Sequence, residues 1–410
     1  MTPQTLQKWH RDKIGNLGRV VTGKTPPTAH KEFYVGEFPF ITPSDISTFD
    51  VRYISDTERT ISSFWASKNK KYILPRDAIT YVCIGSTVGK IGLTEKESIT
   101  NQQINALVAN PLKLVPQYGY YLLRNITPEI QQIASARGAG KGIMNKSQFE
   151  DFDVTVPSVD DQQSIADILS RYDDLIENNT LRIQILEQTS QAVYAEWFVN
   201  FRFPGHEKVK MVNSGTNFGE IPDDWKVTNL SELVDFVRGI EPGSDNYKSE
   251  YKAGRIPFLR VGDLGSRNSN IFIDSDLVGD NVVSKTDIAV TMDGTVGRVA
   301  IGFYGAYSTG IRKLVIKNKI INREYLYLLM LSDFIQDIIK SHAKGTTILH
   351  ASESIKYMQF VLPNQKIMDD LCILAKPLID GILVLREQNQ NLANARNLLI
   401  PKLVTGEIKI

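Results

Sequence analysis

A glycine-rich stretch with a lysine is the first place where residue types and spacing could do chemistry. The letters "GSTVGKIG" at 85–92 follow an apolar run, as the phosphate-binding loop of a nucleotide enzyme does. That loop has the pattern GxxxxGK[ST], because backbone N–H groups wrap the phosphate and the final hydroxyl holds magnesium. Here three residues separate Gly85 from Gly89, and Ile91 follows Lys90. We interpret the stretch as a tight turn between two strands, in which glycines supply positive φ.

Other catalytic patterns are also missing from the sequence. An adenine methyltransferase needs an Asn/Asp-Pro-Pro-aromatic loop for the flipped base, and the nearest match is "NPL" at 110–112. Nuclease-like acid-x-Lys triplets occur at 250–252 and 407–409, but charged chains contain such triplets by chance. The five histidines are scattered, and Cys83 and Cys372 have no ligand neighbours at metal spacing. We expect no catalytic residues and no metal site.

The bulk composition is that of an ordinary soluble protein. The chain has 410 residues, enough for two or three domains with their own cores. No apolar run approaches the ~20 residues of a membrane helix, and the N-terminus lacks the apolar core of a signal peptide. Two isolated cysteines suit a reducing compartment. We therefore expect a cytoplasmic protein with no membrane partner.

Charge is unevenly distributed along the chain. The net charge is +1, but residues 1–159 hold 19 Lys/Arg against 14 Asp/Glu, whereas residues 160–200 hold 2 against 8. An acidic segment thus masks a mildly basic first region, so the near-neutral total does not exclude DNA as a partner.

The glycine-rich stretch belongs to a repeat that covers the chain. It returns as "DGTVGRVAIG" at 293–302, and "FPFITPSDIS" at 38–47 is answered by "IPFLRVGDLG" at 256–265. The period is about 210 residues, which indicates a duplicated domain and not a solenoid repeat. Each copy shows short β-rich runs broken by Gly, Pro, Asp and Asn, with few helical stretches, so each is predicted to be α+β.

A long helix is predicted after each globular copy, because apolar residues recur there with the alternating spacing of a coiled-coil seam. In the first helix the seam is predicted at Ile165, Leu169, Tyr172, Ile176, Asn179, Ile183 and Leu186. In the second helix it is predicted at Leu371, Leu374, Leu378, Leu385 and Leu392. A helix lying on its own domain would show the same period. A polar Asn179 in the seam would cost stability while fixing register and partner choice.

These patterns together predict a fold class. We expect two duplicated α+β domains separated by two long helices that form an antiparallel coiled coil, with pseudo-two-fold symmetry. The predicted segments are a first domain over 1–157, a helix and linker over 158–210, a second domain over 211–362 and a second helix over 363–410. A seam from 165 to 197 spans ~48 Å, or roughly 14 base pairs of duplex, so the helices could act as a ruler.

The ordered motifs carry a family resemblance. The order of "LGRVVTGKTP", "FPFITPSDI", "NQQINALV", "VPSVDDQQSIADILSRYDDLIE" and "GEIPDDWKV" resembles the specificity subunit of Type I restriction–modification systems, over essentially all 410 residues. The family's usual "EEQ" at the helix entry is "DDQ" at 160–162 and "PNQ" at 363–365. These departures bear on the choice of partner.

The resemblance implies a division of labour. The two globular copies would be target-recognition domains, each reading half of an asymmetric two-part sequence of double-stranded DNA. The helices would recruit two methyltransferase subunits, and restriction subunits with motor and nuclease activity would join for cleavage. S-adenosylmethionine, ATP and Mg would be used by those partners, and this chain would need no cofactor.

Cationic and polar side chains of the recurring loops are the candidates for DNA contact, because they can neutralise phosphates or read base edges. In the first copy they are Lys24, Thr25, Ser86, Thr87, Lys90, Gln102, Gln103 and Lys141. In the second copy they are Arg238, Arg260, Thr295, Arg298, Arg312, Lys344 and Thr346. The basic run at 68–76 is most simply a solvated strand edge, with phosphate contact as the alternative.

Acidic residues on the first helix have a different expected role. Asp167, Asp173, Asp174 and Glu177 would repel DNA, so we expect them to face a protein partner or solvent. Two other functions remain open for the chain as a whole. One is a cytoplasmic duplicated coiled-coil scaffold that binds protein partners and not DNA. The other is a self-sufficient nuclease or methyltransferase, which the missing motifs disfavour.

Overall fold

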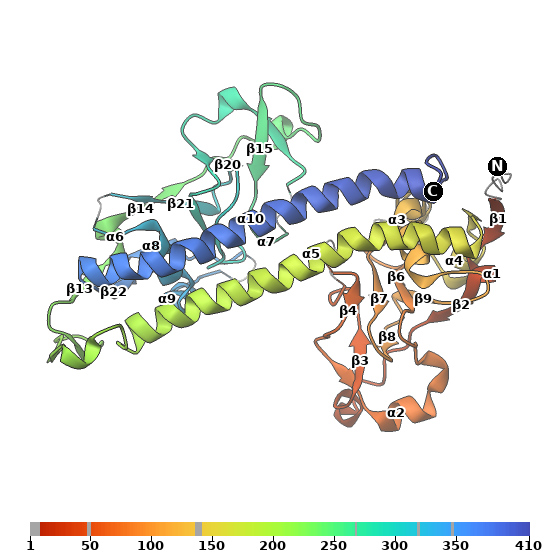
Figure 1. Cartoon of the computed structure of the whole chain (residues 1–410), viewed down its shortest axis with the longest axis horizontal. Coiled ribbons are helices and arrows are strands. Elements are labelled where there is room, and N and C mark those ends of the chain that lie inside the picture. The colour runs from red at the N-terminus through yellow and green to blue at the C-terminus, as the bar shows by residue number, and fades with distance from the viewer. Residues whose placement is uncertain (1–8, 47–50, 136–141, 267–268, 318–319, 346–347) are drawn as a thin grey trace, which may run out of the picture. The chain divides into compact units, whose positions relative to one another are not determined.

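Two long helices run through the structure. They are α5 (Val159–Tyr194) and α10 (Gln365–Val404), drawn in yellow-green and blue in the computed structural model of Figure 1. The structure describes residues 9–46, 51–135, 142–266, 269–317, 320–345 and 348–410. The first of its two compact units comprises Met1–Leu181 with Glu387–Ile410, and the second comprises Arg182–Arg386. Each unit therefore contains its own sheets and a stretch of both long helices.

Both long helices begin at side chains that cap them. The hydroxyl of Ser158 accepts a hydrogen bond from the N–H of Asp161 at 3.2 Å, and the Asn364 side chain accepts one from the N–H of Ile367 at 2.9 Å. Such caps satisfy N–H groups that the first turn leaves without helical partners. Asp160 and Asp161 also place negative charge at the positive end of the α5 dipole.

In the first unit the two helices pair antiparallel. Asp173 contacts Arg396, whereas six residues later Asn179 contacts Gln388, at 3.5 Å between the amide nitrogen and oxygen. Advancing along α5 thus means retreating along α10. Asn179 is 7% exposed, so the predicted polar residue does lie inside the pairing surface, where it favours one register.

The two long helices also contact each other in the second unit. Glu187 forms an ion pair with Arg386, and the Cβ position of Gly381 lies 3.5 Å from a methyl group of Leu186. That distance is an ordinary van der Waals contact, so an alanine would also fit at position 381.

Burial agrees with part of the predicted seam in α5, and the buried stripe of α10 is shifted from the prediction. The buried predicted residues are Ile165, Leu169, Ile176, Asn179, Leu371 and Leu385. Leu374 is wrong: it is 47% exposed, while Ala375, Ile379 and Ile382 are buried. The reason is that this part of α10 also packs on the core of its own unit, which includes Leu371, Ala375 and Ile379. This part of α10 therefore buries residues that face α5 and residues that face the core of its own unit. Its buried stripe is wider than the seam of a coiled coil that stands alone.

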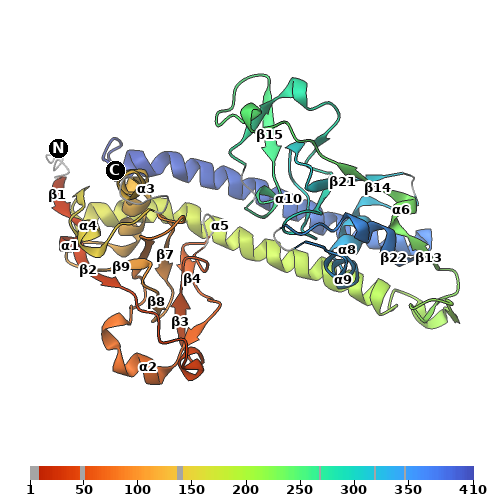
Figure 2. The same ribbon diagram turned by 180° about the vertical axis from the view of Figure 1, so that it is seen from behind.

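The described residues of the first unit form three sheets. A five-stranded sheet has the order β2 (Gly18–Thr22), β9 (Ile104–Ala109), β6 (Ile79–Val82), β7 (Ile91–Thr94) and β4 (Tyr53–Ile54). A three-stranded sheet has the order β5 (Thr60–Ile61), β3 (Phe38–Ile41) and β8 (Ile99–Thr100), and β1 (His10–Lys13) pairs with β10 (Asp153–Val156). The short helices are α1 (Ile14–Leu17), α2 (Ser63–Lys68) and α4 (Lys146–Glu150). The longer α3 (Pro116–Ser135) lies beside α5 and α10, with α2 at the opposite end of this unit (Figures 1 and 2).

The second unit repeats this plan, with four sheets in the part of it that the structure describes. One has the order β14 (Val234–Arg238), β21 (Ile311–Ile316), β18 (Ile288–Thr291) and β19 (Val299–Ala300). Another has the order β16 (Phe272–Asp274), β15 (Arg255–Leu259), β20 (Gly305–Tyr307) and β17 (Val282–Val283). The remaining pairs are β11 (Met211–Asn213) with β12 (Glu220–Pro222), and β13 (Lys226–Asn229) with β22 (Gln359–Leu362). The short helices are α6 (Leu230–Leu233), α7 (Asp263–Ser266), α8 (Arg323–Leu331) and α9 (Asp333–Ser341).

The strand registers of the two units match residue by residue. The matched pairs are Val20–Leu107 with Phe236–Leu314, Ile79–Leu107 with Ile288–Leu314, Phe40–Ile99 with Phe258–Ala306, and Leu74–Ser98 with Val283–Gly305. The predicted duplication and the α+β class are confirmed. The division into four consecutive segments stays a prediction, because each compact unit gathers residues from both long helices.

Candidate nucleic-acid interface

Three loops meet at one edge of the sheets in the first unit. They are loop A (residues 23–26), loop B (42–45) and loop C (101–103), which follow β2, β3 and β8. Strand β9 runs antiparallel to β2 and starts just after loop C, so all three loops lie at the same strand ends. The Lys24 N–H donates to the Thr100 carbonyl at 2.9 Å, and the Thr25 hydroxyl donates to the Gln102 side chain at 2.6 Å. We call this the loop edge.

A glycine in loop A permits the close approach of loop C. A Cβ atom on Gly23 would lie 2.2 Å from the carbonyl oxygens of both Thr100 and Asn101. In the second unit a Cβ on Gly239 would lie 2.1 Å from the Tyr307 carbonyl oxygen. Real Cβ atoms do not come so close to backbone, so any side chain here would push the two loops apart.

The glycine-rich stretch is a turn between antiparallel strands, as predicted. Strands β6 and β7 pair through Tyr81 and Ile91, and Gly85 and Gly89 have φ values of +106° and +99°. The Lys90 ammonium donates to the Pro43 carbonyl at 2.9 Å. The turn therefore joins the loop edge through loop B, and Lys90 holds protein backbone in this structure.

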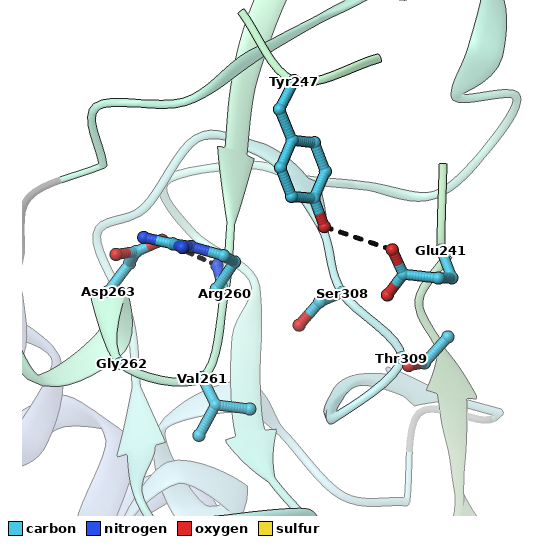
Figure 3. Close-up of a pocket in the computed structure, with 8 residues that line it drawn as sticks. All are labelled: Glu241, Tyr247, Arg260, Val261, Gly262, Asp263, Ser308 and Thr309. Carbon is cyan, nitrogen blue, oxygen red and sulfur yellow. Dashed lines mark hydrogen bonds and ion pairs between the residues drawn. The ribbon is translucent and has the colours of Figure 1, made fainter. Parts of the chain in front are cut away.

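The second unit has the same loop edge with other side chains. Loop B′ (260–263) repeats an aspartate turn: the Asp263 carboxylate accepts from the Arg260 N–H at 2.8 Å, as Asp45 accepts from Thr42 at 2.8 Å. Figure 3 shows this loop lining a hollow together with Glu241. The Tyr247 hydroxyl donates to the Glu241 carboxylate at 3.1 Å, and burial together with this carboxylate raises the pKa of Tyr247.

The hollow is bounded by the same backbone segments as the first loop edge. Glu241 stands where Thr25 does, Arg260 where Thr42 does, and Thr309 where Gln102 does, by the matched registers. The backbone framework is therefore shared, and the side chains presented on it differ.

Comparison with known proteins identifies the family. A family model described as Type I restriction modification DNA specificity domain matches residues 7–188 and 222–376. The chain belongs to this family. The Type I restriction enzyme MjaIX specificity subunit of Methanocaldococcus jannaschii is 27% identical over 413 residues, which cover 98% of this chain and 94% of the relative.

Two further similarities agree. The Type I restriction enzyme HindI specificity subunit of Haemophilus influenzae is 23% identical over 72% of this chain and 78% of the relative. The crystal structure of a Type I restriction–modification system S subunit from M. genitalium covers 98% of both chains at 17% identity, with a TM-score of 0.55. That structural likeness shows a shared fold.

Within this specificity subunit, several predicted contact residues are exposed near the loop edges. Lys24, Ser86 and Gln102 are exposed in the first unit, and Arg238, Arg260 and Thr295 are exposed in the second. Thr25, Thr87 and Gln103 are half-buried. Gln103 accepts a hydrogen bond from the Asn101 side chain at 3.0 Å and so shapes loop C. Lys141 and Thr346 lie outside the described residues.

Arg312 does not fit the prediction that it contacts DNA, because its side chain is buried. It is 7% exposed, and its guanidinium donates to the Ser352 hydroxyl at 2.8 Å and to the carbonyls of Thr309 and Ile311. Burial lowers the pKa of Arg312, since desolvation disfavours the charged form. Its matching residue is Asn105, which accepts from the Thr22 hydroxyl at 2.7 Å. Both residues brace the sheet end and do not face outward.

Two other predicted cations lie against neighbouring parts of the protein, Lys344 against a carboxylate and Arg298 against a short helix. Lys344 donates to Glu353 at 2.6 Å, which raises the pKa of Lys344 and lowers that of Glu353. Arg298 is half-buried, and its guanidinium fills the space where a Cβ on Gly265 would stand. The Arg298 guanidinium therefore lies close to Gly265, just after loop B′.

Asp173, Asp174 and Glu177 hold their own unit together, which corrects their expected partner or solvent role, whereas Asp167 is exposed as expected. Asp173 is 3% exposed and accepts from the Tyr121 hydroxyl and the Arg396 guanidinium. Glu177 and Asp174 accept from Arg52, which is 5% exposed. Burial opposes the charge of Arg52, but the Glu177 carboxylate outweighs it and raises the pKa of Arg52. Sequence spacing could not show that Arg52 and Arg396 reach these acids.

Metal-binding clusters and membrane-spanning helices are both absent from the described residues. Among them, no group of His, Cys, Asp and Glu is placed to hold a metal ion. None of the helices in the described ranges is long and apolar enough to cross a membrane.

Proposed function

We propose that each loop edge of this specificity subunit binds one half of an asymmetric two-part sequence in double-stranded DNA. The observation that supports this proposal is the pair of loop edges with one backbone and different side chains. Lys24, Thr25 and Gln102 in the first unit are replaced by Ile240, Glu241 and Thr309 in the second. Two edges that share a scaffold and differ in donors and acceptors suit two different half-sites.

The exposed side chains at these edges have the chemistry for base and backbone contacts. Gln102 can pair with an adenine edge through two hydrogen bonds, and Arg260 can do the same with guanine. Lys24 can neutralise a phosphate. The Arg260 side chain is 52% exposed, and its Nε lies 3.5 Å from the Asp263 carboxylate, so this acid orients the guanidinium without enclosing it.

The long helices are proposed to recruit two methyltransferase subunits, with restriction subunits joining the complex. Exposed apolar side chains on α10 support a protein contact there, since Ile373 is 72% and Val384 is 54% exposed. Chemistry would belong to those partners, which would use S-adenosylmethionine, ATP and Mg, while this chain would supply recognition without a cofactor. The complex would act in the cytoplasm.

A methylation map tests the function directly. Genomic DNA from source cells with and without this gene would be sequenced for modified adenines. Loss of one two-part methylated motif on deletion supports the proposal and gives both half-sites. If the map is unchanged, salt-dependent DNA binding by the purified chain decides the matter: binding that falls steeply with salt supports DNA recognition, and salt-insensitive binding favours a protein scaffold.

A further inference from the structure

A second basic surface lies on the first unit, outside its loop edge. A hollow there is lined by four cations, Arg19, Lys24, Lys71 and Lys146, all of them exposed. Tyr72 lies among them. Only Lys24 also belongs to loop A, so the surface starts at the loop edge and continues along β2 to its first residues.

Two of the cations lie against one aromatic ring. The ammonium groups of Lys71 and Lys24 lie 5.1 and 5.7 Å from the centroid of the Tyr72 ring. A 3-10 helix (Lys70–Tyr72) places Lys71 and Tyr72, and the Tyr72 ring stacks on Trp65 at 6.3 Å. The aromatic wall is therefore fixed in the core of the unit, and the two lysines lie against it.

Little negative charge within the described residues balances these cations. Lys146 lies 3.5 Å from Glu150, its neighbour one helical turn away. For Arg19, Lys24 and Lys71, the described part of the chain offers no carboxylate within ion-pair distance. Like charges repel one another, so a cluster of this kind favours an external anion.

The second unit repeats the fold of the first, so its residues at the matching positions show whether the fold needs these cations. By the matched registers, Arg19 corresponds to Asp235, Lys24 to Ile240 and Lys71 to Asp280. The second unit thus builds the same strands with two acids and one apolar residue at these places. Asp235 there pairs with Lys317 at 3.0 Å. The fold of β2 and loop A therefore does not require positive charge at the positions of Arg19 and Lys24.

We propose that this surface binds the sugar–phosphate backbone of duplex DNA beyond the first half-site, and that the second unit makes no corresponding contact. The proposal rests on the proposed function, because it extends the first loop edge along the duplex. Residues 19–24 span ~17 Å of strand, enough to face several successive phosphates of one DNA strand. The contact would add affinity without adding sequence information.

The salt dependence of DNA binding by the full chain tests the proposal. The probe is a fluorescent duplex of about 30 base pairs, titrated from about 50 to about 300 mM KCl. The variant Arg19→Gln/Lys71→Gln removes two cations and leaves Lys24 in place. The matched control is Lys96→Gln/Lys402→Gln, which removes two exposed cations of the first unit that do not line the hollow. Thermal unfolding of each variant checks that it folds.

The expected result is a specific loss of salt dependence. Each lost phosphate contact lowers the slope of log K against log salt by about 0.9, so the first variant should lose about 2 and the control nothing. Arg19→Asp/Lys71→Asp, which copies the residues of the second unit, should weaken binding further. An unchanged slope in the first variant, or an equal loss of slope in the control, overturns the DNA contact proposed for this surface and leaves the proposed function of the loop edges standing. A wild-type chain that shows no salt-dependent binding overturns the proposed function itself.

Discussion

Removing the Arg396 guanidinium should destabilise the first unit while sparing the second. The Arg396 side chain is 2% exposed and that of Asp173 is 4% exposed, and the two form an ion pair inside the helix pair. The Tyr121 hydroxyl of α3 donates to the same carboxylate. Asp173 lies on α5, Arg396 on α10 and Tyr121 on α3, so these contacts join both long helices to α3. Asp173 and Arg396 are nevertheless 223 positions apart in sequence.

The expected loss of folding stability follows from the burial of both charged side chains. In Arg396→Met the Asp173 carboxylate stays buried with only the Tyr121 hydroxyl as partner, and breaking a buried ion pair on one side costs about 3–5 kcal/mol. Replacing both partners, in Asp173→Leu/Arg396→Met, removes the unpaired charge, and such exchanges are often close to neutral. Tyr121 then lacks its acceptor, which costs about 1–3 kcal/mol.

Hydrogen exchange along a urea series measures the effect in each unit separately, since a chain with two units need not unfold in one step. Protection of Ile104–Ala109 reports on the first unit, and protection of Ile311–Ile316 reports on the second. With a slope of about 2–3 kcal/mol per molar urea, Arg396→Met should move the first midpoint down by about 1–2 M and leave the other in place.

A control on the same helix is Lys376→Met, which breaks an exposed ion pair with Asp380. Exposed pairs contribute about 0–1 kcal/mol, so both midpoints should stay close to those of the wild type. The reasoning is refuted if Arg396→Met costs no more than this control, or if the double variant is less stable than Arg396→Met alone.

Three further predictions address the loop edge, the thiols and the helices. Gly23→Ala should separate loops A and C and weaken DNA binding several-fold; unchanged binding would show that their close approach is dispensable. Burial raises the pKa of Cys83 and of Cys372 to about 12 each, so at pH 8 both thiols stay protonated and should react slowly with iodoacetamide until urea unfolds the chain. Rapid labelling of the native chain would contradict this. Adding one heptad to each long helix lengthens it by ~10.5 Å, which should widen the unread spacer of the methylated motif by roughly three base pairs, whereas an unaltered spacer would argue against the helices as a ruler.

Much of the architecture could be predicted from the sequence because its signals are local or repeated. The return of "GSTVGKIG" as "DGTVGRVAIG" indicated the duplication, and the strand registers confirm it. The spacing of Gly85 and Gly89 excluded a phosphate-binding loop, and their positive φ values agree with the predicted turn. The seam of α5 was also predictable, because helical periodicity depends only on neighbours three and four residues apart.

Contacts between distant segments could not be predicted in this way. Leu374 fits the heptad pattern, yet it is exposed because the core of the second unit draws a neighbouring stripe of α10 inward. Arg312 has the chemistry of a DNA contact, but the Ser352 hydroxyl and two carbonyls take up its guanidinium. In both cases the surroundings of the side chain are set by residues far away in the sequence, which local spacing does not indicate.

The sequence by itself thus determined the duplication, the α+β class and the two long helices, since periodicity and repetition are written into neighbouring residues. Only the tertiary structure decided which charged residues serve the fold and which face outward. Asp173 and Arg396 pair in the interior, whereas Arg19 and Lys71 remain exposed. The physical reason is that the fate of a charge depends on its burial and its partners, and both are set by residues far away in the chain.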